Sequence, residues 1–176
     1  MKFSETKLAG AFVIEPEPHG DHRGFFARMY CANEFAAHGL ATHMVQSNLS
    51  RSALKHTLRG MHYQVDGAEE AKLVRCTQGA ILDTIVDVRP GSPTFKQYVQ
   101  VELTEDNMRM LYVPPGFAHG FITLRDNCDI FYQVSNFYAP GRERGIRWND
   151  PSIGITWPTD APVMSDKDKA YPDFAH

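Results

Sequence analysis

Short runs of alternating apolar and polar residues, separated by glycine, proline and asparagine, recur along most of the chain. This period of two is typical of strands, whose successive side chains point to opposite faces. The runs are 11–14, 25–30, 43–50, 56–64, 71–77, 80–88, 96–103, 109–113, 120–124 and 128–137. One segment, 33–38, favours a helix, and Gly39 follows it as a stop. After Tyr138 the chain is rich in Pro, Gly and Asp and predicts long loops. So many evenly spaced strands predict an all-β sandwich or barrel with few short helices.

Three polar side chains are in phase with the apolar residues of their own strands. Lys72 lies in run 71–77, Asp83 in run 80–88 and Tyr132 in run 128–137. A polar residue on an apolar face lies either at the rim of a core or inside it for a purpose. These three positions are therefore candidates for a cavity.

Arg59 and His62 have opposite parity within run 56–64. A regular strand cannot turn both side chains inward, because inward positions are two residues apart. Gly60 lies between them, and a bulge there would place both on one face.

Composition narrows the class of protein. The chain has 176 residues, of which 43% are hydrophobic and 22% charged, which suits one globular domain over residues 1–176. A net charge of −3 gives no general attraction to nucleic acid. Three cysteines without metal spacing fit a reducing compartment. With neither a signal peptide nor an apolar run long enough to span a membrane, we expect a cytoplasmic protein.

Two histidine motifs indicate the fold. Pro114-Pro115-Gly116-Phe117-Ala118-His119 resembles the second signature of cupins, Pro-x-Gly-x-x-His. The first cupin signature carries His-x-His, and here it reads His62-Tyr63-Gln64. We therefore expect a cupin (jelly-roll) β-barrel with a few short peripheral helices, whose chemistry uses side chains and no metal.

Motifs along about 150 residues then resemble one family, the dTDP-4-dehydrorhamnose 3,5-epimerases. Their shared order makes the resemblance specific. The matching segments are 21–26, 46–50, 58–64, 72–76, 87–89, 91–94, 114–121, Tyr132, 148–151, 157–158 and 165–168.

The resemblance implies a cofactor-independent isomerase of deoxysugar biosynthesis. Its reaction converts dTDP-4-dehydro-6-deoxyglucose to dTDP-4-dehydro-L-rhamnose by epimerisation at C3 and C5. His62 resembles the base, Asp168 its carboxylate partner, Lys72 the cation beside the enolate, and Tyr132 the acid on the far face. Histidine suits the base because its pKa lies near ~6.5. A phenol, with a pKa near ~10, stays protonated at neutral pH.

The resemblance also implies how the nucleotide diphosphate binds. Arg23 and Arg59 resemble the diphosphate ligands, since a guanidinium suits phosphate oxygens. Phe26 and Tyr138 resemble the aromatic residues that sandwich the thymine. The remaining expected substrate-binding residues are Gln46, Asn48, His119 and Glu143. A strand near the N-terminus crosses to the partner in this family, so we expect a homodimer with sites completed across the interface by Arg23 and Phe26.

The chain departs from the family pattern in two places. Where the family has Phe-Phe-x-Glu, this chain has Phe25-Phe26-Ala27-Arg28, and where it has Gln-Asp-Asn-His-Ser, residues 46–50 read Gln-Ser-Asn-Leu-Ser. We expect both departures to lie in the nucleotide pocket. The nucleotide therefore stays open, as does the choice between C3, C5 or both, and another nucleotide 4-keto sugar is an alternative substrate.

Two alternatives come from other classes. A metal-dependent cupin oxygenase would use His62, Gln64, Glu69 and His119, although Gln64 is a poor replacement for a second histidine. A sugar-nucleotide-binding module without catalysis would need none of His62, Lys72, Tyr132 and Asp168.

Overall fold

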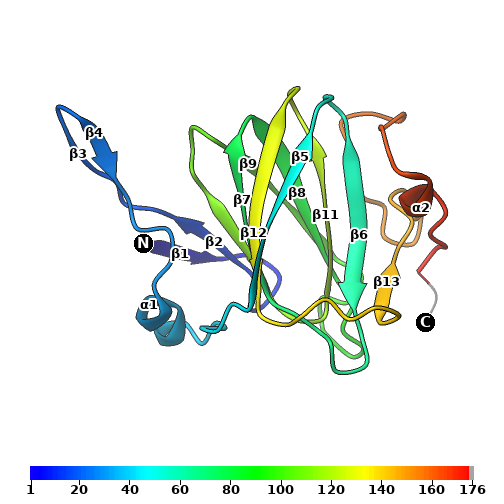
Figure 1. Ribbon diagram of the computed structural model, residues 1–176. Helices are drawn as coiled ribbons and strands as arrows, with labels where there is room; N and C mark the ends of the chain where they lie inside the picture. The colour runs from blue at the N-terminus through cyan, green and yellow to red at the C-terminus, as the bar shows by residue number, and fades with distance from the viewer. Residues whose placement is uncertain (175–176) are drawn as a thin grey trace.

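A computed structural model describes residues 1–174 of the chain and consists mainly of antiparallel strands (Figure 1). The strands are β1 (Lys2–Glu5), β2 (Phe12–Glu15), β3 (His19–Asp21), β4 (Gly24–Phe26), β5 (Gln46–Ser52), β6 (Leu58–Gln64), β7 (Lys72–Gln78), β8 (Ala80–Asp87), β9 (Tyr98–Thr104), β10 (Met110–Val113), β11 (Phe117–Thr123), β12 (Cys128–Val134) and β13 (Glu143–Gly145). The helices of this part of the chain are α1 (Ala32–Ala37) and α2 (Asp166–Lys169).

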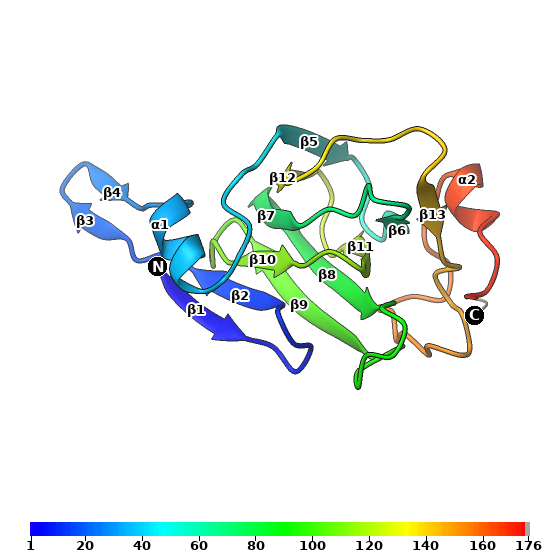
Figure 2. The ribbon, with the colours of Figure 1, turned by 90° about the horizontal axis from the view of Figure 1, so that it is seen from below.

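The strands form two sheets that enclose the core. One has the order β1-β2-β10-β7-β12-β5 and the other β13-β6-β11-β8-β9. Seen from below, the two sheets wrap around a common interior, with α2 and β13 beside β6 at one end (Figure 2). The β3–β4 hairpin projects away from the barrel at the opposite end (Figure 1).

The predicted alternation accounts for the interior. Val74, Ile81, Ile85 and Ile130 are fully buried in the cluster between the sheets. Asp83 is also fully buried, and Tyr132 packs against the same cluster. The in-phase polar residues of these strands therefore point inward, as expected.

Two further clusters cover the outer faces. Residues after β13, including Ile146 and Trp157, pack on Met61 and Ile122 of the five-stranded sheet. Phe35 of α1 packs on the other sheet. Burying one such large apolar side chain contributes roughly 1.5–3 kcal/mol. The C-terminal segment is thereby held beside β6, where it supplies part of the site.

The boundaries of several predicted elements were wrong. Strand β11 begins at Phe117, three residues before the expected run 120–124, because the turn at 114–116 is tight. The runs 25–30 and 128–137 pair over fewer residues than expected, and run 43–50 starts pairing at Gln46. The expected loops after Tyr138 contain β13 and α2, and β1 and β3 were missed as well. The missed strands β1, β3 and β13 are only three or four residues long, so each shows little alternation in the sequence.

Within residues 1–174, no helix is long and apolar enough to cross a membrane.

Candidate active site

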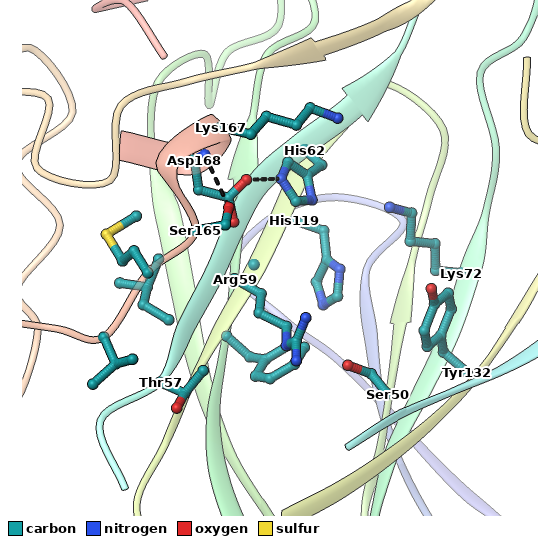
Figure 3. Close-up of a pocket in the computed structure, with 15 residues that line it drawn as sticks. Ser50, Thr57, Arg59, His62, Lys72, His119, Tyr132, Ser165, Lys167 and Asp168 are labelled. Atoms are coloured by element: carbon teal, nitrogen blue, oxygen red, sulfur yellow. Dashed lines mark hydrogen bonds and ion pairs between the residues drawn. The ribbon is translucent and has the colours of Figure 1, made fainter. Parts of the chain in front are cut away.

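A cavity of about 540 Å³ opens between β6, β11 and the strands of the opposite sheet (Figure 3). A second cavity of about 260 Å³ adjoins it and shares His62, Lys72 and Tyr132 in its lining. Ten of the twelve predicted site residues line one or both cavities: His62, Tyr132, Asp168, Lys72, Gln46, Asn48, Arg59, His119, Tyr138 and Glu143.

The predicted irregularity in β6 places Arg59 and His62 in the same cavity. Between the pairs His119↔His62 and Phe121↔Arg59, β6 advances by three residues while β11 advances by two. Gly60 has φ +122°, and a Cβ there would lie 2.6 Å from the Gly120 Cα. Only glycine suits this backbone and this close approach.

His62 and Asp168 form a hydrogen-bonded pair from different parts of the chain. The Nε2 of His62 lies 2.7 Å from Oδ1 of Asp168 (Figure 3). The other carboxylate oxygen accepts from the Gly60 N–H at 3.2 Å. Ser165 caps α2 by accepting from the Asp168 N–H at 3.1 Å. The dyad is therefore fixed by a strand irregularity on one side and a helix cap on the other.

The carboxyl group of Asp168 is buried, with 5% of the residue exposed. Burial alone raises the pKa of Asp168, but the hydrogen bond and charge of His62 and the Gly60 N–H outweigh it and lower that pKa below its ordinary value. The group is thus ionised and accepts a hydrogen bond from the Nε2–H of His62. The other ring nitrogen, Nδ1, is then free to act as a base.

A second histidine pair lies beside the first. His119 is the cross-strand partner of His62, and its Nε2 lies 2.7 Å from Oδ1 of the fully buried Asp83. The predicted phase of Asp83 gave the signal for this contact, although its partner was not foreseen. The pair fixes the His119 ring at the wall of the larger cavity.

Lys72 and Tyr132 lie on the side of the cavity away from Asp168 (Figure 3). The Lys72 Nζ lies 3.3 Å from Oε1 of Glu70, and each side chain is 12% exposed. Burial and the charge of Glu70 raise the pKa of Tyr132, and Arg59 opposes them. The phenol is therefore held protonated. No motif in the sequence indicated Glu70.

The smaller cavity contains the residues expected at the nucleotide base. Gln46 and Asn48 are on β5, and the Gln46 Oε1 accepts from the backbone N–H of Tyr138 at 2.9 Å. Tyr138 is 58% exposed, so its ring is open to a ligand. Glu143 forms an ion pair with Lys167, which lines the larger cavity. That contact raises the pKa of Lys167 to about 12.

Sequence reasoning also missed Tyr171, whose ring lies edge-on to His62 with centroids 5.7 Å apart. A Cβ at Gly145 would lie 2.3 Å from the Tyr171 ring. Gly145 pairs with His62 across β13 and β6, so the missing side chain leaves room for the tyrosine beside the imidazole.

Arg23 and Phe26 are placed apart from the other ten residues, on the β3–β4 hairpin. Their side chains border other hollows, formed with His19. The Arg23 guanidinium pairs with Asp21 at 2.5 Å and is 79% exposed, and Phe26 is 67% exposed.

The expectation that both sequence departures lie in the nucleotide pocket was wrong for Ser47 and Leu49. Both are exposed, and they alternate along β5 with Gln46, Asn48 and Ser50, which line the cavities. Alternation therefore turns them to the outer face. Arg28 lies in a hollow with Phe26 and pairs with Glu34 at 3.7 Å.

The four residues of the metal alternative do not assemble into a ligand set. His62 and His119 are each bonded to an aspartate, Glu69 is exposed, and the Gln64 amide bonds to backbone and Glu70. Within residues 1–174, no group of three His, Cys, Asp or Glu side chains could hold a metal ion.

The comparisons with known proteins agree with this geometry. The family model described as dTDP-4-dehydrorhamnose 3,5-epimerase matches residues 5–176. The chain belongs to this family. The epimerase of Shigella flexneri is 44% identical over 169 residues, which cover 96% of this chain and 93% of the relative.

Solved structures of epimerases match along nearly the whole chain. The dTDP-4-dehydrorhamnose 3,5-epimerase of Bacillus anthracis, solved with TDP and PPi bound, has a TM-score of 0.95 and 42% identity, and covers 98% of this chain and 99% of its own. A 3'-monoepimerase of Streptomyces bikiniensis in complex with dTDP-quinovose has a TM-score of 0.88 and 36% identity. The match covers 96% of this chain and 85% of the monoepimerase chain. The similarity to these structures confirms the expected cupin jelly roll. Membership of the dTDP-4-dehydrorhamnose 3,5-epimerase family confirms the expected isomerase class.

Proposed function

We propose that this epimerase acts without a cofactor on a dTDP-4-keto-6-deoxy-hexose. With inversion at both C3 and C5, dTDP-4-dehydro-6-deoxyglucose becomes dTDP-4-dehydro-L-rhamnose. The observation that carries the proposal is the pairing of a fixed His62–Asp168 dyad on one side of a cavity with Lys72 and Tyr132 on another. Epimerisation beside a ketone needs a base and an acid on opposite faces of the carbon.

The base step follows from the dyad. Nδ1 of His62 removes the proton from the carbon next to the ketone, and the imidazolium that forms is stabilised by the ionised Asp168 at 2.7 Å. The electrons of the broken C–H bond move to the ketone oxygen, which becomes an enolate. Lys72 stabilises that oxygen, and fixed charge of this kind is usually the largest catalytic contribution.

The acid step uses Tyr132. The phenol donates its proton to the enolate carbon from the face away from His62, which inverts the centre. The pKa of Tyr132 is raised by burial and by Glu70, so the proton is present at neutral pH. His119, held by Asp83, faces the same space and is proposed to bind the sugar.

Nucleotide binding is proposed for the smaller cavity and for Arg59. Gln46, Asn48 and Glu143 offer polar groups to the base edge, and the exposed ring of Tyr138 offers a stacking face. Stacking of a base on an aromatic ring contributes about 1–3 kcal/mol.

We also propose that the protein is a homodimer whose sites are completed by Arg23 and Phe26 of the other protomer. The projecting hairpin with two phenylalanines more than 60% exposed supports this arrangement. Mixed dimers of an Arg23→Ala chain and a His62→Ala chain should regain activity, because one site then holds both wild-type residues. An absence of rescue in verified mixed dimers would show that Arg23 serves its own chain.

Proton NMR of dTDP-4-keto-6-deoxyglucose in D2O with the protein tests the reaction. We expect deuterium at C3, C5 or both in the presence of wild type, and none with His62→Ala. Deuterium at one carbon alone would identify a single-position epimerase, as the matching structure of a 3'-monoepimerase is described. No exchange at either carbon with folded wild-type protein would refute the proposed function.

A further inference from the structure

Glu70 is a charged residue in the site that the mechanism above does not use directly. It follows Glu69 in the loop before β7, two residues from Lys72. Glu69 is exposed, whereas the Glu70 side chain is 12% exposed and lines the smaller cavity with Lys72 and Tyr132. Two adjacent glutamates thus have opposite environments.

The Glu70 carboxylate is held at both oxygens. Oε1 lies 3.3 Å from the Lys72 Nζ, and Oε2 accepts from the Gln64 Nε2 at 2.9 Å. Gln64 is itself fixed, since its Nε2 also faces the Ala68 carbonyl at 3.0 Å and its Oε1 accepts from the Ala139 N–H at 2.8 Å. With Gln64 only 5% exposed, the carboxylate has a rigid support.

A lysine side chain has a flexible four-carbon stem, so an unanchored ammonium samples many positions. Catalysis by a fixed charge requires that the charge be placed before the reaction. We propose that Glu70, supported by Gln64, is a positioning residue that holds the Lys72 ammonium at the site of the developing enolate. This inference rests on the proposed function and extends it.

The negative charge has a second consequence at Tyr132. It adds to burial in raising the pKa of the phenol and so helps to keep the acid protonated, while Arg59 acts in the opposite direction. The remaining ionisable side chains that share the cavities with Tyr132 are His62 and Tyr63 of β6, Lys72 of β7, His119 of β11, Tyr138 after β12, Glu143 of β13, and Lys167 and Asp168 of α2.

The variant Glu70→Gln removes the charge and keeps an oxygen that can accept from Gln64. Glu69→Gln removes the same charge one residue away, at an exposed position, and is the matched control. We expect kcat of Glu70→Gln to fall about tenfold or more, since the ion pair that holds the Lys72 ammonium in place is lost. We expect KM to change little, because Lys72 acts mainly in the transition state.

The pH profile separates positioning from a structural role. Without Glu70, the Tyr132 phenol loses a neighbouring charge that raises its pKa and favours its protonated form. The alkaline limb of kcat should therefore move to lower pH in Glu70→Gln, stay in place in Glu69→Gln, and return toward wild type in Glu70→Asp. Titration with dTDP should show unchanged binding in all three variants.

A wild-type rate and pH profile in Glu70→Gln would overturn the inference, as would equal effects of Glu69→Gln and Glu70→Gln. Loss of dTDP binding and activity together with a lowered melting temperature would show that Glu70 only maintains the fold, and would overturn the inference as well. A wild-type protein without epimerase activity would instead refute the proposed function, so the two failures are distinguishable.

Discussion

Replacing Asp168 by asparagine keeps the shape of the side chain and removes its charge. The Gly60 N–H donates to this side chain at 3.2 Å and requires an oxygen there. The asparagine oxygen therefore turns to Gly60, and its NH2 group faces the Nε2 of His62. Nε2 must then accept, so the proton of the neutral imidazole moves to Nδ1. The nitrogen that should act as the base is thereby blocked.

The size of the effect follows from two losses. The charged hydrogen bond at 2.7 Å no longer stabilises the imidazolium, which costs about 1.5–3 kcal/mol, or about 10- to 150-fold in rate. The wrong tautomer adds to this, and the same exchange in a Ser–His–Asp triad lowers kcat about 10⁴-fold. We therefore expect kcat of Asp168→Asn to fall by about 10²- to 10⁴-fold, and less than that of His62→Ala, which removes the base itself.

Deuterium wash-in from D2O measures the base step without the later inversion. Its rate should fall in parallel with kcat in Asp168→Asn, while dTDP binding stays close to wild type. Wild-type exchange in the variant would refute the role of the dyad. A fall of only a few fold would mean that the tautomer is set by some contact other than the one at Gly60.

Four further predictions follow from the described geometry. Tyr132→Phe should retain deuterium exchange while inversion fails, and normal inversion, followed by NMR of the product, would exclude Tyr132 as the acid. Gly60→Ala should lower the melting temperature and the activity, because the added Cβ would lie 2.6 Å from the Gly120 Cα. An unchanged melting curve would contradict this close approach. The pKa of Asp168 is lowered in the folded protein, so its carboxylate stabilises the fold at pH values above its pKa in the unfolded chain, near ~4. This contribution is lost as the pH falls through the pKa of the folded protein. Between pH 7 and pH 3, the free energy of unfolding measured with urea should therefore decrease less in Asp168→Asn than in wild type. Activity should survive EDTA, whereas loss with recovery on adding one specific metal would favour the oxygenase alternative.

The all-β class and most inward-facing positions could be predicted from the sequence. In a strand with one buried face, apolar and polar residues alternate, so the pattern records which side chains are buried. Parity alone put Lys72, Asp83 and Tyr132 in phase with apolar residues, at the rim of a core or inside it. A bulge at Gly60 was proposed because Arg59 and His62 have opposite parity. The resemblance to the family named ten residues from separate segments, and the structure places these ten around the two cavities.

Contacts between distant segments were less predictable. Glu70 lies in a loop without a periodic pattern, and its role depends on where the Gln64 amide points. Tyr171 reaches His62 only because Gly145 leaves space for its ring. The positions of Ser47 and Leu49 were misjudged because the motif was taken as a unit, although adjacent strand residues face opposite ways.

The additional residue in β6 has a use beyond the orientation of its neighbours. Opposite β11, the stretch from Arg59 to His62 contains one residue more than a regular ladder needs, so a chain one residue shorter would still turn both side chains inward. The longer chain instead releases an amide from the sheet and directs it to the Asp168 carboxylate. In a barrel with a regular strand here, a carboxylate in the place of Asp168 would have one backbone donor fewer.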